Sequence, residues 1–141
     1  MAEQGKMDFE HLLGLHTGIR SDPLPVSEID PSTARAIGAR TRHVLLSADT
    51  VRKQIAHHRE LPISVYRCLG TCLSRGEYRQ DSPRSALVLF TDDQIFQTHF
   101  RAYLKATIRG DEIYLLSFLM MRDRDVRREQ RKPYPIIRPS R

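Results

Sequence analysis

A strict two-residue alternation in the second half of the chain constrains the fold more than any other feature of this sequence. Between residues 100 and 108, apolar side chains occupy every second position, and mostly polar side chains stand between them. Because successive side chains of a strand point to opposite faces, this period predicts a half-buried strand. Gly110 and Asp111 can form a tight turn, and residues 113–118 are again rich in strand-forming side chains. We therefore expect a β-hairpin over residues 100–118.

The polar face of this hairpin is the expected working surface of the protein. A two-residue turn pairs Ile108 with Ile113, and Ser117 then lies on the opposite face of the hairpin. A three-residue loop with a bulge shifts the pairing by one residue, and Ser117 then shares a face with Lys105. The sequence leaves both registers open. The polar-face positions of the first strand are Arg101, Tyr103, Lys105 and Thr107.

Length and composition set the class of protein. The chain has 141 residues, 40% of them hydrophobic, which fits one domain with a substantial core. No run approaches the roughly 18 apolar residues of a membrane span, and the first residues lack the apolar core of a signal peptide. We expect a soluble intracellular protein with no membrane partner. Cys68 and Cys72 share one helical face as small core residues, and they are too few for a zinc site.

The basic charge is concentrated at one end of the chain. The formal net charge is +6, but residues 1–42 carry −1, residues 43–121 carry +2 and residues 122–141 carry +5. A cationic segment beside a folded domain favours a polyanion, and nucleic acid is the commonest intracellular one. A solvated basic tail without a specific partner is the alternative. The candidate nucleic-acid contacts in this segment are Arg122, Arg124, Arg127, Arg128, Arg131 and Lys132.

Composition divides the chain into three segments. Residues 1–42 predict an N-terminal arm, with a short helix over residues 7–15, an extended stretch around Pro23 and Pro25, and one helical turn over residues 33–37. Residues 43–121 predict the folded domain. Residues 122–141 predict a C-terminal arm, with a charged helix over residues 123–132 and a proline-rich extended end.

Within residues 43–121, helical and strand patterns follow one another. Residues 43–47 predict a strand, after which Ser47 or Asp49 can cap a helix whose apolar stripe runs through Val51, Ile55 and His58. A second helix is expected over residues 63–73, and residues 86–90 form the most apolar strand. This order predicts an α+β domain with N-terminal helices packed on one face of a small antiparallel sheet, flanked by extended arms.

The sequence lacks several common catalytic motifs, but it contains the residue types that acid–base catalysis at a phosphodiester needs. It has no glycine-rich phosphate loop, no His-Glu-x-x-His and no Gly-x-Ser-x-Gly, which disfavours ATP use, zinc hydrolysis and serine-hydrolase chemistry. Histidine, lysine, arginine and hydroxyl side chains remain. They suit metal-independent RNA cleavage, in which the ribose 2′-hydroxyl attacks its own phosphodiester and the protein moves protons and neutralises charge. No cofactor is expected.

Three short stretches resemble a known family. Residues 44–58 (VLLSADTVRKQIAHH), 103–107 (YLKAT) and 112–118 (EIYLLSF) are similar to the phage-type branch of the barnase, EndoU, colicin and RelE-like RNase superfamily. The resemblance covers about residues 42–120. It implies a barnase/EndoU/RelE-like fold in a phage or prophage protein, located in the host cytoplasm or in the virion.

The resemblance also implies catalytic roles. It places the functional histidine at His58, but Arg59 stands where the family commonly has proline, which leaves His57 as an alternative. The remaining family positions are Lys105, Thr107 and Ser117. Lys53 and Arg101 are further candidates for phosphate contact.

Two functions are therefore expected. The first is a metal-independent endoribonuclease that acts on RNA. The second is a phage virion structural or accessory protein that keeps the RNase-like fold without activity and binds neighbouring subunits or nucleic acid. In the second case neither residue is catalytic. His58 is then a hydrogen-bonded core residue, and Lys105 is a solvated side chain.

Overall fold

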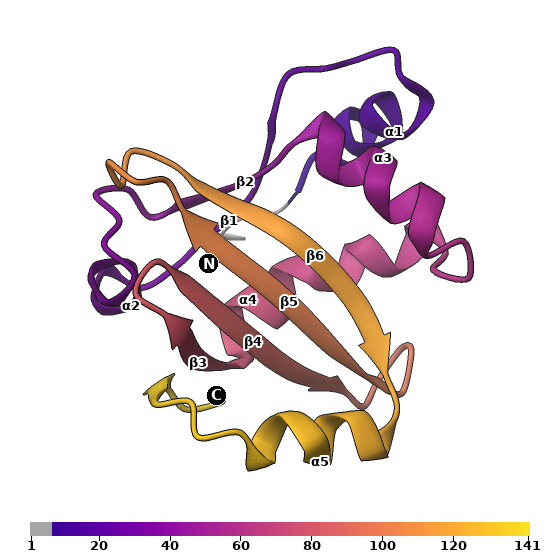
Figure 1. Cartoon of the computed structure of the whole chain (residues 1–141). Coiled ribbons are helices and arrows are strands. Elements are labelled where there is room, and N and C mark those ends of the chain that lie inside the picture. Colours follow the sequence, from indigo (N-terminus) through magenta and orange to yellow (C-terminus); the bar gives the residue numbers. More distant parts are fainter. Residues whose placement is uncertain (1–6) are drawn as a thin grey trace.

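The computed structural model describes residues 7–141, and it contains helices and strands throughout that range (Figure 1). None of the described helices is long and apolar enough to cross a membrane. The helices are α1 (Phe9–Thr17), α2 (Pro31–Ala36), α3 (Ala48–His57), the 3-10 helix η1 (Ile63–Cys68), α4 (Leu69–Arg75) and α5 (Asp123–Arg131). The strands are β1 (Leu24–Glu28), β2 (His43–Leu46), β3 (Glu77–Ser82), β4 (Ser85–Asp92), β5 (Thr98–Ala106), β6 (Ile113–Met121) and β7 (Ile136–Arg138).

The strands form one seven-stranded sheet in the order β1-β2-β6-β5-β4-β3-β7. The α+β class is as predicted, but the sheet is larger than expected and is mixed, because β2 runs parallel to β6 while all other pairs are antiparallel. Strand β3 was not predicted, since residues 77–82 are mostly polar. Its backbone pairs with β4 on one side and β7 on the other, so neighbours in the fold stabilise a strand that its own side chains do not favour.

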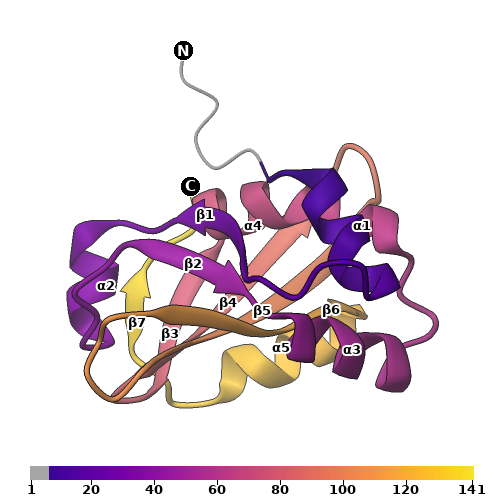
Figure 2. The same cartoon turned by 90° about the horizontal axis from the view of Figure 1, so that it is seen from above.

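Helices cover both faces of this sheet. On the inner face, α4 packs against β4 and β5, α3 packs against β6, and α1 packs against α3. Helix α5 packs along a border of the outer face, on the side of the sheet opposite α4 (Figures 1 and 2). The N-terminal helices lie on one face as expected, whereas α5, which was expected to be part of an extended arm, packs on the other. The side chain of Val126 accounts for its position, because it packs on an apolar cluster of Leu87, Leu89 and Met121 on the outer face.

The predicted hairpin is confirmed as β5 and β6, joined by residues 107–112. Near the loop Ala106 pairs with Ile113, and a bulge in β6 then shifts the pairing so that Tyr103 faces Ser117. Ser117 therefore shares a face with Lys105, as in the second of the two registers considered, but the loop is longer than either register assumed and contains Ile108. Gly110 adopts a φ of 76°, and a side chain there would collide with the carbonyl oxygen of Gly38.

Helix α3 begins as predicted but buries a different face. The hydroxyl of Ser47 accepts a hydrogen bond from the Thr50 amide at 3.1 Å and caps the helix. Its buried face runs through Val51 and Gln54 instead of Ile55 and His58. The Gln54 amide accounts for the rotation, because its nitrogen donates to the Phe118 carbonyl at 2.8 Å and its oxygen accepts from the Phe118 amide at 3.4 Å. The Gln54 side chain thus provides hydrogen-bond partners for the backbone of β6 where β2 no longer lies beside it.

The two segments expected to be extended arms are part of the folded unit. Residues 7–42 contribute α1, β1 and α2, and their side chains Leu12, Leu24 and Ile37 are buried in the main core. Residues 122–141 contribute α5 and β7. The prolines near residue 24 do favour extended backbone, as expected. That backbone becomes a strand because β2 lies beside it and supplies hydrogen-bond partners.

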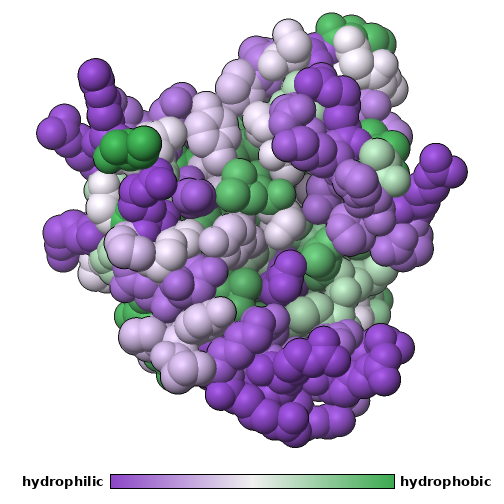
Figure 3. All heavy atoms as spheres, in the orientation of Figure 1, coloured by the Kyte–Doolittle hydropathy of each residue, from purple (hydrophilic) through white to green (hydrophobic). Residues whose placement is uncertain are grey.

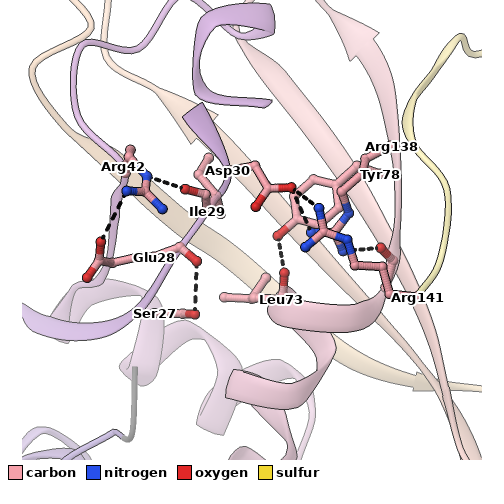
Figure 4. Close-up of polar contacts among 10 residues, drawn as sticks. Ser27, Glu28, Ile29, Asp30, Arg42, Leu73, Tyr78, Arg138 and Arg141 are labelled. Atoms are coloured by element: carbon pink, nitrogen blue, oxygen red, sulfur yellow. Dashed lines mark hydrogen bonds and ion pairs between the residues drawn. The ribbon is translucent and has the colours of Figure 1, made fainter. Parts of the chain in front are cut away.

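An ion-pair network joins the two edges of the sheet (Figure 4). Asp30, two residues after β1, accepts from Arg138 of β7 at 3.5 Å and from Arg141 at 2.5 Å. Arg138 also donates to the Gly76 carbonyl at 2.6 Å and lies over the ring of Tyr78. Because Asp30 follows one edge strand and Arg138 belongs to the other, this ion pair connects the segments at the two ends of the strand order. We interpret this network as structural, since its charges are internally paired.

Candidate nucleic-acid interface and acid–base site

The outer face of β5 carries the polar residues that the alternation predicted. Arg101, Tyr103 and Lys105 are half-buried on this face, and His99 extends the same series by one position toward the start of the strand. The residues that alternate with them, Phe100, Ala102, Leu104 and Ala106, are buried against the inner helices. Helix α5 lies along one border of this outer face (Figure 1).

Arg101 lies beneath α5 and already has an anionic partner. Its Nη1 is 3.7 Å from the carboxylate of Glu129, which also pairs with Lys132 Nζ at 3.0 Å. The Nε atom of Arg101 is buried without a hydrogen-bond partner among the described residues. Arg101 and Ser117 line one hollow of about 210 Å³ together with Tyr103, Glu129, Lys132 and Tyr134. Cations, hydroxyls and an internal carboxylate thus meet in one small polar hollow.

Lys105 and Thr107 lie at the loop end of the hairpin. Lys105 pairs across the sheet with Ser85 and Tyr114 and is half-exposed. The Thr107 hydroxyl donates to the Glu112 carbonyl at 3.3 Å and accepts from the Glu112 amide at 3.2 Å. These two bonds close the loop, so Thr107 has a structural use that the sequence did not reveal.

His57 and His58 lie at the end of α3, in a different part of the molecule. His58 Nδ1 is 3.5 Å from the Glu60 carboxylate, and the ring lines a hollow of about 30 Å³ beside Gln54 and Tyr66. Such a hollow has room for about one or two waters, not for a nucleotide. It shares no residue with the hollow that Ser117 lines. The histidine and serine that the resemblance implies are therefore not brought into one hollow, and their catalytic roles stay predictions.

His99, which no sequence motif indicated, has a side-chain partner at each ring nitrogen. Its Nδ1 is 2.7 Å from the Thr91 hydroxyl, and its Nε2 is 2.5 Å from the Asp123 carboxylate. Three elements supply this arrangement, namely β4, β5 and the first residue of α5. Extending the alternation of β5 back by two residues from Arg101 reaches His99. This pattern would have placed His99 among the polar-face residues. Asp123 has no such signal, because 24 residues separate it from His99.

The loop between β4 and β5 is held beside this histidine. Asp92, next to Thr91, accepts hydrogen bonds from the amides of Gln94, Ile95 and Phe96 at 3.3, 3.2 and 2.6 Å. These amides, that of Phe96 above all, lower the pKa of the Asp92 carboxyl. The ionised carboxylate therefore stabilises the loop that approaches His99.

Arginines form a stripe on the exposed side of α5. Their spacing of three, four and seven residues places them on one helical face, which turns away from the sheet. Strongly hydrophilic side chains gather over this helix (Figure 3). Arg122, just before the helix, and Arg128 both lie near Asp125, at 3.5 and 3.8 Å. We define the arginine stripe as Arg124, Arg127, Arg128 and Arg131, all exposed.

Other candidate groups are less suited to chemistry. Lys53 on α3 is paired with Asp49 at 3.1 Å and lies on the exposed side of that helix. Cys68 and Cys72 are buried free thiols, and burial raises the pKa of Cys68 to about 11, so it stays protonated near neutral pH. Within residues 7–141, no group of three histidine, cysteine or acidic side chains is arranged to hold a metal ion.

Comparison of the chain with protein-family models, with curated proteins and with solved structures finds no match. The resemblance to the barnase-type RNase superfamily stays a prediction, and the function is argued from the arrangement of the residues themselves.

Proposed function

We propose that this protein binds RNA along α5 and the adjoining outer face of the sheet, and cleaves it through the ribose 2′-hydroxyl without a metal ion. One observation carries the proposal. The arginine stripe lies on a helix that packs along the border of the same sheet face on which β5 presents a histidine, an arginine and a lysine. Phosphate-binding cations and an acid–base group therefore share one side of the molecule.

The arginine stripe has the charge density expected of a phosphate-binding surface. Arg124–Arg128 and Arg127–Arg131 are like-charge pairs four residues apart, which weaken an isolated helix by about 0.2–0.5 kcal/mol each. Among the described residues, the carboxylate within ion-pair distance of the stripe is that of Asp125, which lies near Arg128. A bound phosphate removes this repulsion, and guanidinium groups bind phosphate oxygens in a bidentate manner.

The dimensions of the stripe fit a short nucleic-acid segment. Seven residues of helix separate its first and last arginines, which corresponds to about 10 Å. Nucleotides in a stacked strand rise by about 3.4 Å each, so the stripe spans about three of them. The partner implied is a single strand or the edge of a duplex. RNA is favoured over DNA because the available acid–base groups suit a reaction that uses the 2′-hydroxyl as nucleophile.

Salt-dependent binding tests the interface. A fluorescently labelled single-stranded RNA would be titrated with the full chain at several salt concentrations. Four arginine–phosphate contacts predict a slope of log K against log [salt] of about −3, and Arg127→Ala with Arg131→Ala should reduce its magnitude by about 1.4.

The matched control removes two exposed arginines outside the stripe, Arg35 and Arg40, and lowers the net charge equally. An equal loss of slope in both double variants would show that only net charge matters and would contradict a defined interface.

Product analysis tests the chemistry. Incubation with RNA in excess EDTA should yield 2′,3′-cyclic phosphate and 5′-hydroxyl ends, and a substrate with a single 2′-deoxy nucleotide at the cut site should resist cleavage. Cleavage that depends on added metal, or that ignores the deoxy substitution, would contradict this mechanism.

A second candidate function is favoured by the state of Arg101. Because Glu129 already neutralises this arginine under α5, the sheet face offers an incoming phosphate less free charge than the stripe does. RNA binding without cleavage would support the alternative of a nucleic-acid-binding structural or accessory protein of a phage virion.

A further inference from the structure

We propose that Thr91, His99 and Asp123 form the proton-transfer centre of this protein, with His99 as the acid–base group for RNA cleavage. The inference rests on the proposed RNA-cleaving function and assigns its chemistry to residues that neither the motifs nor the resemblance indicated. It starts from an imidazole whose two nitrogens both lie within hydrogen-bond distance of a side chain, at 2.7 Å from Thr91 and 2.5 Å from Asp123.

The chemistry of the two partners sets the direction of these hydrogen bonds. A carboxylate only accepts, so the Nε2 atom of His99 carries a proton and donates it to Asp123. In the neutral ring Nδ1 then has a free lone pair, which accepts the hydroxyl proton of Thr91. The result is a hydroxyl, an imidazole and a carboxylate in series, the arrangement in which a histidine removes a proton from a hydroxyl group.

The sheet register builds this series. Thr91, His99 and Met121 are direct neighbours across β4, β5 and β6. Asp123 follows Met121 by two residues and opens α5, whose own position is set by Val126 packing on the outer apolar cluster. Backbone pairing holds Thr91 and His99, and helix packing holds Asp123. Asp92 fixes the loop that follows Thr91 in the chain.

A substrate can reach the hydroxyl end of the series. Thr91 is exposed, and Thr91 and His99 line two hollows, one of about 610 Å³ and one of about 490 Å³. The larger hollow also contains Asp123 and Arg122, whose guanidinium group is largely exposed. A cation that can contact a phosphate therefore stands beside the proton-transfer groups. The hollow of about 30 Å³ at His58 offers no comparable space.

The proposed reaction balances without any further reagent. The 2′-oxygen gives its proton to Thr91 Oγ1 as Thr91 passes its own hydroxyl proton to His99 Nδ1, and the 2′-oxygen forms a bond to phosphorus. The bond from phosphorus to the 5′-oxygen breaks, and that oxygen takes a proton back from the imidazolium by the same route. The products are a 2′,3′-cyclic phosphate and a 5′-hydroxyl, with no net release of protons. Asp123 is a positioning residue that stabilises the imidazolium.

Cleavage rates of full-length variants in EDTA test this assignment. His99→Ala should lower the rate by about 10²–10⁴-fold while RNA affinity stays within about twofold. Imidazole added to a His99→Gly variant should restore part of the activity, which a purely structural histidine would not allow. Thr91→Val and Asp123→Asn should each reduce the rate, while Thr91→Ser and Asp123→Glu should retain more of it.

Two further histidine variants complete the design. His43→Ala removes an exposed histidine of β2 and should leave the rate unchanged, while the His57→Ala, His58→Ala double variant tests the site that the resemblance implies. Full activity of a folded His99→Ala variant would overturn the inference and leave the proposed function standing, as would loss of activity without rescue by imidazole. Absence of cleavage by the unaltered protein would overturn the RNA-cleaving function itself, and this inference with it.

Discussion

The two faces of β5 differ in almost every property although they belong to one nine-residue strand. On the inner face Phe100, Ala102, Leu104 and Ala106 are at most 1% exposed and form the centre of the core. On the outer face the side chains from His99 to Lys105 are half-buried and polar. Because alternate residues face opposite ways, one strand can stabilise the fold with one face and carry chemistry on the other. The comparison teaches that candidate functional residues here can be changed without opening the core.

The outer face is itself uneven, because α5 covers only one border of it. Under the helix, Leu87, Leu89 and Met121 form a second small apolar cluster. At one side of this cluster lies His99 with its partners, and at the other lie Tyr103, Ser117 and Lys105. The helix therefore stabilises the part of the outer face on which it packs, and the apolar cluster separates two polar regions.

The largest expected effect is a core substitution on the inner face. Phe100 stacks on Phe118 with ring centroids 5.1 Å apart and meets Phe96 edge to face. Phe100→Ala should lower the free energy of unfolding by about 3–5 kcal/mol, because it removes buried area and leaves a cavity. Urea denaturation measures the loss, and Ile108→Ala, at an 86% exposed position, is the control. Equal effects at the two positions would contradict the contrast between the faces.

A buried polar contact should have the next largest effect. Gln54→Ala leaves the amide and carbonyl of Phe118 unpaired and removes the bond to the Tyr66 hydroxyl. We expect a loss of about 2 kcal/mol, the cost of leaving buried polar groups without partners. Thermal and urea unfolding would be compared with Gln130→Ala, which alters an exposed glutamine. A loss below about 0.5 kcal/mol would mean that water replaces the side chain at the edge of β6.

A smaller, pH-dependent effect is expected in the loop that leads to the outer face. The folded-state pKa of Asp92 lies below its ordinary value of 3.8, so its contribution is present above pH 3.8 and is lost as pH falls through the lower folded value. Asp92→Asn should cost about 1 kcal/mol at neutral pH, and the difference from the unaltered protein should shrink below about pH 4. Urea midpoints at pH 7, 4 and 3 measure this, with the exposed neighbour Asp93→Asn as control. A constant difference at all three pH values would contradict the role of the ionised carboxylate.

The smallest effect on stability is expected at the exposed end of the outer face. Lys105→Ala should change the free energy of unfolding by no more than about 0.5 kcal/mol. If Lys105 contacts a phosphate, the salt slope of RNA binding should fall in magnitude by about 0.7. A stability loss above 1 kcal/mol would show that the outer face cannot be separated from the core.

Much of the fold followed from local patterns. The alternation of residues 100–108, the cap at Ser47 and the apolar run at residues 86–90 correctly predicted β5, the start of α3 and the centre of β4. The charged pattern after residue 122 predicted α5 to within one residue. These features depend on backbone geometry and on neighbours close in sequence, so the sequence contains their signals. The two cysteines are also buried, as their spacing predicted.

The candidate site was predicted only in part. Arg101, Tyr103 and Lys105 share a face as the alternation required, and the register that joins Ser117 to them needed the bulge in β6. His99 was missed because its importance depends on Thr91 and Asp123, which come from other elements. The alternation placed Thr107 on the polar face, but its hydroxyl forms hydrogen bonds that close the loop between β5 and β6.

By itself the sequence determined the β5–β6 hairpin, the start of α3, the centre of β4, the basic helix α5 and which side chains of β5 face together. Only the tertiary structure decided that residues 7–42 join the core, that β2 lies parallel to β6, and that α5 packs on the outer face. The physical reason is that periodicity tells which face of an element is apolar but not which distant element will cover it. A site made of Thr91, His99 and Asp123 depends on that second choice, because strand register and helix packing bring its three members together.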